Sequence, residues 1–400
     1  MFSRMQVITV QSVIGGIPSV SSVVLITILL VVLMIIGIII FLKIMRELPS
    51  LDNLLVLIKQ GENDAKNYPI EMPKRKGLTD YLLSIGTLSA DHLAFSNFYV
   101  MTANLGGFFS PVKTAAFCKE AIQYAIQAGA RCIIFDIWPN SSKGAKQGPI
   151  LQVCANDDSI EKISYYTLDL RTAFEEVNKW AFEDSANPHS NDPMILYLRF
   201  RGKPVANTFT ETATALIKVF QQRRLPYNFT STSSNPLYST PINTVLPGKI
   251  IILSDQPGTG TSFAEWVNNP VPPNNSPFQR KTIATPGEVR GLTSDQSSTL
   301  DNTCTQNLMA CAPLPEDISN SESNGWNWKG AQKVGIQDCG LNLWVQDKGL
   351  DTYMAPNMFG TYSFMIKPNN PPPHRYTIER IPPPIPVKDL GYGTGTLTVR

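Results

Sequence analysis

Histidine is scarce in this chain of 400 residues, which holds only His92, His189 and His374. Acid–base catalysis by a pair of histidines, or a zinc site built on several, must use these three residues or be absent. Charge is scarce too, at 16% of residues with a formal net charge of +2, so we expect no nucleic-acid partner. Apolar residues make up 43% of the chain, which excludes a wholly disordered protein.

The N-terminal part lacks charge altogether between Arg4 and Lys43. Within this gap, residues 23–42 form an apolar run interrupted only by one threonine and one glycine. A helix of this length spans the roughly 30 Å hydrocarbon layer of a bilayer, and the run is longer than the apolar region of a signal peptide. We therefore expect an N-terminal segment, 1–22, followed by a single transmembrane helix at 23–42 that contacts the lipid bilayer.

Basic residues are concentrated after the apolar run, at Lys43, Arg46 and the triplet 74–76. The positive-inside rule therefore places the large C-terminal part on the cytoplasmic side. The absence of any CxxC pair among the six cysteines fits a compartment that keeps thiols reduced. Residues 43–79 are interpreted as a short amphipathic juxtamembrane helix, with leucines at helical spacing, and a basic linker.

From about residue 80 the pattern alternates between strands and helices. The strands are expected at 97–101, 131–138, 194–200 and 249–253, and the helices after Ser110-Pro111 and at 167–182 and 208–222. Such repeated units favour a parallel α/β barrel or a doubly wound sheet. Residues 256–330 are rich in Pro, Asn, Ser and Thr and are interpreted as a polar insertion. Residues 369–400 form a Pro-rich tail, expected to be extended and to lie along a partner or along the domain itself. The polar insertion and the tail are the segments expected to contact protein partners.

Five motifs occur in a fixed order within residues 80–368. They are the strand at 98–107 with the segment from Gly129 to Trp138 (Gly-x-Arg-x-x-x-x-Asp-x-Trp), Pro193-Met-Ile-Leu, Gly248-Lys-Ile-Ile, the Gly-x-Gln-x-x-x-Leu-Asn box from Gly335 to Asn342, and Lys367-Pro368. This order resembles the eukaryotic-type phosphoinositide-specific phospholipase C barrel. The resemblance implies a distorted (β/α)8 TIM-type barrel preceded by the transmembrane helix.

The same resemblance implies two catalytic histidines and a calcium ion, but the matching positions hold other residues. Asn104 and a residue near Val153 stand in place of the histidines, and Ile134 and Arg199 stand in place of two calcium-binding glutamates. Of this set, Asp136 is retained. Calcium needs about six to eight oxygen ligands, so we expect no metal, no cofactor and no catalytic residue. Instead, Arg199 is expected to form an ion pair with Asp136 or another acid.

Three functional hypotheses follow. The first is a membrane-anchored phospholipase-C-like pseudoenzyme with a structural or protein-binding role. Similar barrels occur in large DNA viruses, so the resemblance also implies that such a protein could be a component of a virion membrane or capsid. The second is a module that binds phosphoinositide or phosphodiester groups through Asp136, Arg199 and Arg201, since the two arginines alternate along a strand and share a face. If the two arginines have only a structural role, one pairs with Asp136 and the other with an acidic residue of a loop. The third hypothesis is a residual, metal-independent phosphodiesterase.

Overall fold

The protein divides into two compact units, Met1–Lys59 and Gln60–Arg400. The computed structural model describes residues 31–38, 75–86, 90–108, 117–140, 148–152, 167–183, 187, 189–226, 229, 236–268, 276–278, 281–314, 324–345, 347–368 and 373–377.

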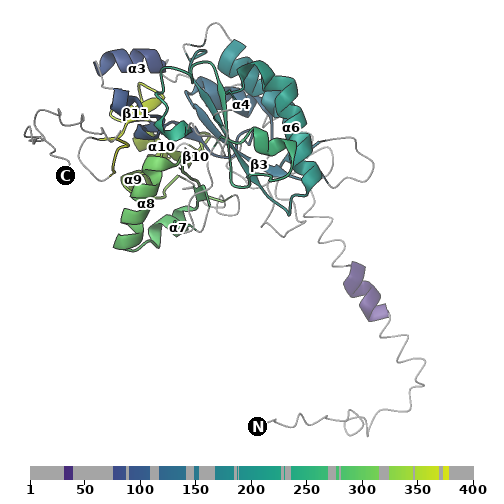
Figure 1. Ribbon diagram of the computed structural model, residues 1–400. Coiled ribbons are helices and arrows are strands. Elements are labelled where there is room, and N and C mark those ends of the chain that lie inside the picture. Colours follow the sequence, from purple (N-terminus) through teal and green to yellow (C-terminus); the bar gives the residue numbers. More distant parts are fainter. Residues whose placement is uncertain are drawn as a thin grey trace, which may run out of the picture. The chain divides into compact units, whose positions relative to one another are not determined.

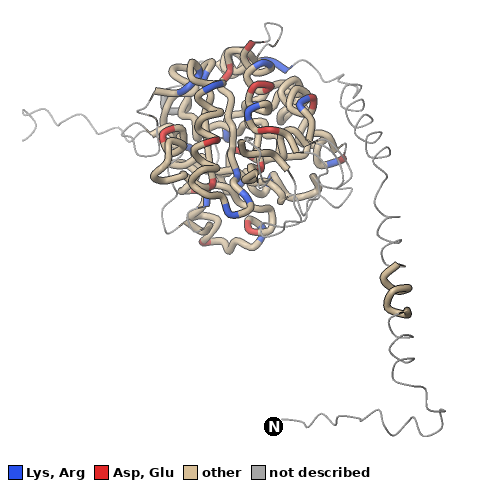
Figure 2. The backbone as a smooth tube through the Cα atoms, turned by 90° about the vertical axis from the view of Figure 1, so that its right-hand side faces the viewer, with Lys and Arg blue, Asp and Glu red and all other residues tan. Residues whose placement is uncertain are grey.

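In the first unit, the described residues 31–38 form a helix without a charged side chain (Figure 2). Its seven large apolar side chains are all between 45% and 66% exposed. Among the described residues, no helix is long and apolar enough to cross a membrane. The rest of the predicted span 23–42 and the predicted amphipathic helix of the 43–79 segment lie outside the described residues, so both remain predictions.

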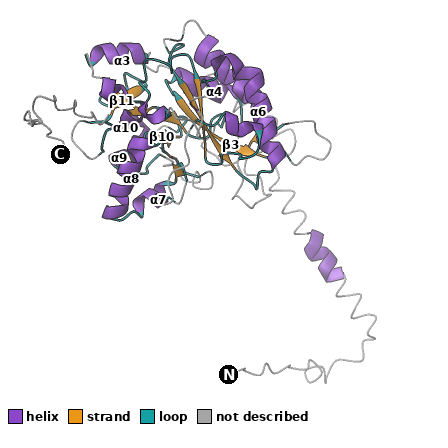
Figure 3. Ribbon diagram, in the orientation of Figure 1, coloured by secondary structure: helices purple, strands orange, loops and turns teal. Residues whose placement is uncertain are grey.

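The second unit has a mixed α/β fold around a nine-stranded sheet (Figures 1 and 3). Seven strands run parallel in the order β7-β6-β3-β2-β10-β9-β8. β4 pairs antiparallel with the end of β3, and β5 pairs antiparallel with β4. The sheet contains β2 (Thr102–Ala103), β3 (Cys132–Trp138), β4 (Ile150–Leu151), β5 (Leu168–Asp169), β6 (Met194–Phe200), β7 (Ile250–Ser254), β8 (Ile283–Ala284), β9 (Ala310–Cys311) and β10 (Asp338–Leu341). A separate antiparallel pair joins β1 (Phe98–Val100) to β11 (Phe364–Ile366).

Helices surround the strands in Figure 3. The α-helices are α3 (Leu78–Ser84), α4 (Lys119–Gln127), α5 (Leu170–Asn178), α6 (Ala206–Phe220), α7 (Pro286–Arg290), α8 (Ser294–Gln306), α9 (Trp328–Lys333) and α10 (Lys348–Tyr353). Short helical turns are η2 (Ala90–Leu93), η3 (Phe95–Asn97), η5 (Gln221–Arg223), η7 (Leu237–Ser239) and η8 (Ser262–Glu265), and α5 continues into the π-helical turn η4 (Lys179–Glu183).

Local sequence signals explain where several helices begin and end. The Asp169 carboxylate accepts a 3.0 Å hydrogen bond from the Thr172 backbone N–H and so caps the start of α5. After α4, Gly129 has a φ of +101°, a left-handed conformation that glycine adopts without the steric penalty of a side chain. These signals explain where α5 begins and where α4 ends.

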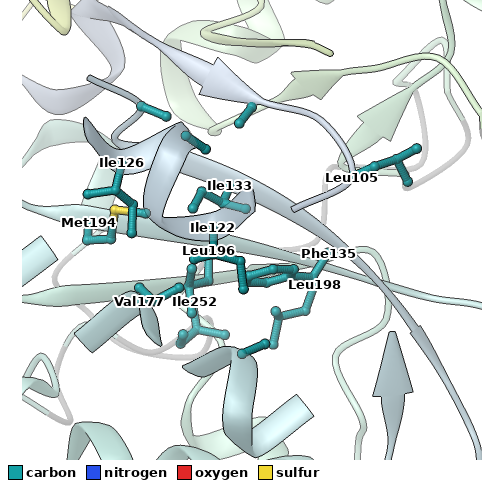
Figure 4. Close-up of a cluster of buried hydrophobic side chains, with 14 of the residues drawn as sticks. Leu105, Ile122, Ile126, Ile133, Phe135, Val177, Met194, Leu196, Leu198 and Ile252 are labelled. Carbon is teal, nitrogen blue, oxygen red and sulfur yellow. The ribbon is translucent and has the colours of Figure 1, made fainter. Parts of the chain in front are cut away.

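The two faces of the sheet carry different clusters. Side chains alternate along β3, so Ile133 and Phe135 pack among residues of the helices in the cluster shown in Figure 4. The opposite face, here called the inner face, carries Ile134 of β3. On the inner face, Tyr197 of β6 and Ala310 of β9 belong to one cluster although their strands lie far apart in the sheet order. The sheet must therefore curve so that these two strands face each other. The described residues supply seven of the eight parallel strands expected for the predicted barrel.

The strand predictions are confirmed where the apolar pattern is strong. The strand at 194–200 is β6 without a shift. The strand at 131–138 begins one residue before β3, and the strand at 249–253 is displaced by one residue from β7. The interpretation of 256–330 as an insertion outside the sheet is wrong, because β8 and β9 belong to the sheet. The reason is weak patterning: α8 is rich in Ser, Thr, Asn and Asp and buries only two apolar side chains, Leu300 and Cys304.

The predicted boundary of the domain needs correction at its N-terminal end, and part of the C-terminal tail lies along the domain, as one of the two expectations had it. Arg75, assigned to the basic linker, is only 3% exposed and donates from Nε to the Phe359 carbonyl oxygen at 2.5 Å and from Nη1 to the Ala128 carbonyl oxygen. It is therefore part of the domain and does not belong to a solvated linker. Within the predicted tail 369–400, residues 373–377 are described, and they lie against the domain through His374 and Tyr376.

Candidate functional site

The carboxyl ends of β3 and β6 bring two of the predicted site residues together. In the parallel register, Asp136 lies directly opposite Arg199. Asp136 follows Ile134 on the inner face because successive side chains of a strand alternate between faces. Ligand sites of parallel sheets generally lie at this end of the strands, so this pair is the starting point for a functional site.

Asp136 and Arg199 form the expected ion pair. Arg199 Nε lies 2.5 Å from Asp136 Oδ1, and the two residues are 4% and 1% exposed. Two other buried atoms of the pair, Asp136 Oδ2 and Arg199 Nη2, have no hydrogen-bond partner among the described residues. The site therefore combines a compensated pair of charges with one unused acceptor and one unused donor.

A second carboxyl group stands beside the pair. Asp255 follows β7 directly, is partly buried, and accepts a 3.0 Å hydrogen bond from the Phe200 backbone N–H. Burial raises its pKa from 3.8 to about 7, while the hydrogen bond and the charge of Arg199 act in the opposite direction. Asp255 was not among the predicted site residues, although its position just after a buried strand was a signal for it.

Asn104 occupies the position where the family resemblance places a histidine. It is 2% exposed and donates from Nδ2 to the Pro313 carbonyl oxygen and to Asn342 Oδ1, both at 3.2 Å. Asn342 is in turn held by Asn324, whose side-chain oxygen accepts from the Asn342 backbone N–H at 2.7 Å. A carboxamide neither gains nor loses a proton near neutral pH, so this chain of asparagines provides positions for hydrogen bonds and no acid or base.

The residues around Asp136 do not fit a calcium ion. Ile134 supplies no oxygen, Arg199 brings a positive charge to 2.5 Å from the carboxylate, and calcium requires about six to eight oxygen ligands. Ile134 is packed tightly, since a Cβ on Gly340 would lie 2.8 Å from its Cδ1 atom. No group of three or more His, Cys, Asp or Glu residues in the described part of the chain has the geometry of a metal site.

The structure gives less information on the other two predicted positions, Arg201 and Val153. Arg201 is 3% exposed and follows Arg199 by two positions, and its backbone N–H donates to the Ile137 carbonyl oxygen at 2.9 Å. A role for Arg201 in ligand binding remains a prediction. Val153, the second position expected to have lost a histidine, lies outside the described residues.

All three histidines lie at the opposite, N-terminal end of the strands. His189 precedes β6 and its Nδ1 lies 2.8 Å from Asp192 Oδ2, and burial lowers the pKa of its imidazole. His92 belongs to η2, which precedes β1, and His374 lies beside Asp301 in the C-terminal segment. With a rise of about 3.3 Å per residue, β6 alone separates His189 from Arg199 by more than 15 Å. No histidine is therefore positioned to act with Asp136.

Comparisons with solved structures find phospholipases C of similar fold. L. pealei PLC21 is 13% identical with a TM-score of 0.48, and the match covers 82% of this chain and 45% of that chain. The calcium-dependent phosphoinositol-specific phospholipase C of Pseudomonas sp. is 12% identical with a TM-score of 0.44, over 70% of this chain and 97% of that chain. The phosphatidylinositol-specific enzyme of Listeria monocytogenes is 12% identical with a TM-score of 0.34, over 66% and 96%.

The chain spans less than half the length of the L. pealei protein, and at these identities the similarity concerns the fold. No family model matches the sequence, and no curated protein matches it either.

Proposed function

We propose that this chain is a phospholipase-C-like barrel that does not catalyse and serves as a membrane-tethered structural or protein-binding module. The observation that carries the proposal is the buried ion pair between Asp136 and Arg199. It places a fixed cation where a phosphodiesterase of the resembling family would hold a metal, and it uses the retained carboxylate. The distribution of the histidines supports the same conclusion, since removing an acid or a base costs about 10²–10⁴-fold in rate.

The tether is proposed from the first unit. A helix that is apolar on every face is stable in lipid and not in water, and the described residues 31–38 have this character. Lys43 and Arg46 follow the predicted span 23–42 and favour the cytoplasmic side for the domain. The proposed setting is a cellular membrane or the inner membrane of a virion, with proteins bound through the Pro-rich tail.

The test of the proposal is an assay of the full chain in vesicles that contain phosphatidylinositol, with and without calcium. We expect no release of inositol phosphate under either condition. Phosphatidylinositol-specific phospholipase C from Listeria monocytogenes, added to the same vesicles, verifies that the lipid is accessible. Calcium-dependent release by this chain would overturn the proposal.

A second candidate function, binding of a phosphoinositide headgroup without turnover, is favoured by a specific feature. Four buried atoms near the ion pair have no hydrogen-bond partner among the described residues: the acceptors Asp136 Oδ2 and Asn104 Oδ1 and the donors Arg199 Nη2 and Asn342 Nδ2. Unmet buried groups of both kinds suit a ligand that carries hydroxyl groups and negative charge.

Calorimetric titration of the full chain with soluble inositol phosphates separates the two functions. The headgroup function requires binding that weakens at least tenfold in Arg199→Ala and is unchanged in Arg171→Ala, an exposed arginine paired with Glu175 on α5. Absence of binding by the unmodified chain removes the second candidate and leaves the first.

A further inference from the structure

The C-terminal segment 373–377, here called the strap, is held on the domain at the N-terminal end of the strands. It contacts residues from three separate elements: Asn97 at the end of η3, Asp301 on α8 and Tyr238 on η7. Arg375 also donates to the Lys367 carbonyl oxygen just after β11. Segments distant in sequence therefore form one surface that receives five consecutive residues.

Part of this surface recognises the backbone of the strap. The Asn97 side chain accepts from the Tyr376 backbone N–H at 2.6 Å and donates to the Tyr376 carbonyl oxygen at 3.1 Å. Asn97 thus pairs with both backbone groups of one residue, as a neighbouring strand would. The Asp301 carboxylate accepts from the His374 backbone N–H at 2.9 Å. Such contacts fix an extended peptide whatever its side chains are.

Two further contacts select side chains. His374 Nδ1 lies 2.7 Å from Asp301 Oδ2, and the ring of Tyr376 packs edge-on against the ring of Tyr238 with 5.5 Å between centroids. The two selected side chains are separated by one residue, so they leave an extended backbone on the same side. The two side chains of the strap that contact the domain in this way are thus a histidine and a tyrosine at this spacing.

The receiving groups are built into the domain. Asn97 is fully buried, and its backbone oxygen accepts from the Lys367 N–H at 2.8 Å, which fixes the residue. Asp301 is 3% exposed, and a Cβ on Gly335 would lie 2.9 Å from its Oδ1 atom, so the glycine leaves space for the carboxylate. Within the described part of the chain, the hydrogen bonds of the Asp301 carboxylate all go to His374. Without these donors the buried Asp301 carboxylate would have no hydrogen-bond partner among the described residues and only the charge of the buried Lys367 to offset its own, so an occupant of the site is favoured.

We propose that this surface is a peptide-recognition site for an extended segment of the form His-x-Tyr, and that the strap fills it as a ligand within the same chain. The consecutive prolines 371–373 favour an extended conformation that leads the strap into the site. A partner protein with a His-x-Tyr segment docks by displacing the strap. The proposal concerns the end of the domain opposite to Asp136 and is independent of whether the chain catalyses.

Binding of a labelled peptide to the full chain tests the site, with the sequence Pro-Pro-His-Arg-Tyr-Thr of residues 372–377 as the probe. The double variant His374→Ala with Tyr376→Ala weakens the strap and should bind the peptide at least tenfold more tightly than the unmodified chain. The unmodified chain binds weakly because its own strap competes at high effective concentration. Equal affinity of the two proteins would overturn the proposal.

Peptide controls keep the test independent of folding defects. A peptide with alanine in place of both His and Tyr should bind the double variant at least tenfold more weakly than the probe, because both selected side chains are gone. If the two peptides bind alike, the specificity for His-x-Tyr is refuted. Adding Asp301→Asn to the double variant, an isosteric change, should also reduce binding of the probe tenfold, and unchanged binding would place the peptide elsewhere.

Discussion

The two ends of the parallel strands use buried charge in different ways. At the carboxyl end, Arg199 lies on the strand between those of Asp136 and Asp255, and it forms an ion pair with Asp136. The cluster offers hydrogen-bonding atoms but contains no histidine. A site of this composition can hold a ligand and has little means of moving a proton at neutral pH, apart from the Asp255 carboxyl group.

The N-terminal end is richer in titratable groups. Asp192 accepts from His189 and from the Leu78 backbone N–H, which fixes the first turn of α3. Nearby, burial lowers the pKa of Lys367 to about 8, and at the same end of the sheet burial raises the pKa of Asp338 to about 8. In strand–helix barrels this end serves stability, whereas ligands are handled at the other end. His189 and Asp192 therefore serve to hold the domain together, whereas Asp301 and His374 at the same end belong to the proposed peptide site.

Of the variants that test this contrast, Arg199→Ala is expected to cause the largest loss of stability. Removing one partner leaves the Asp136 carboxylate buried and unpaired, which costs about 3–5 kcal/mol of unfolding free energy. Urea denaturation of the full chain in detergent micelles, followed by tryptophan fluorescence, measures the loss.

The matched control is the double variant Asp136→Asn with Arg199→Met, which removes both charges and keeps similar volumes. It should lose much less stability than Arg199→Ala, because no buried charge is left alone. A loss below about 1 kcal/mol for Arg199→Ala would mean that the pair is not a structural element of the carboxyl end.

The residues at the carboxyl end of the strands were predicted from the sequence better than those at the N-terminal end. The family resemblance singled out Asp136 and Arg199 and predicted an ion pair of Arg199 with Asp136 or another acid. Both residues lie on long apolar strands, whose pattern fixes register and face and places the two side by side. Asp255 directly follows a buried strand, which was a signal, but it was missed because that position alone does not show that the acid lies beside Arg199. The strap site was also missed, since Asn97, Asp301 and His374 lie more than 70 residues apart and are joined only by tertiary packing.

At the N-terminal end, Asp192→Asn is expected to have the next largest effect. The variant keeps the shape of the side chain but weakens the charge-assisted hydrogen bonds from Leu78 and His189, at a cost of about 1.5–3 kcal/mol. The same urea measurement applies. Arg171→Ala is the control, since its ion pair with Glu175 is half exposed and contributes only about 0.3–0.5 kcal/mol. If Asp192→Asn and Arg171→Ala lowered the unfolding free energy by the same amount, the buried hydrogen bonds of Asp192 would stabilise the domain no more than an exposed ion pair does.

The smallest expected effect is a change in how stability depends on pH. It would show whether the negative charges at the carboxyl end of the strands are fully offset by Arg199. The pKa of Asp255 is raised from 3.8 to about 7, mainly by burial, so the folded state holds this proton more tightly than the unfolded state. The contribution is therefore present at low pH and is lost as pH rises from about 4 through 7. Asp255→Asn, which cannot ionise, should make stability less dependent on pH over this range, by an amount that solvent reduces because the residue is partly exposed. Unfolding midpoints at pH 5 and pH 8 measure the change. An unaltered pH dependence would mean that Arg199 already compensates both carboxylates, and the carboxyl end would then carry no titrating group near neutral pH.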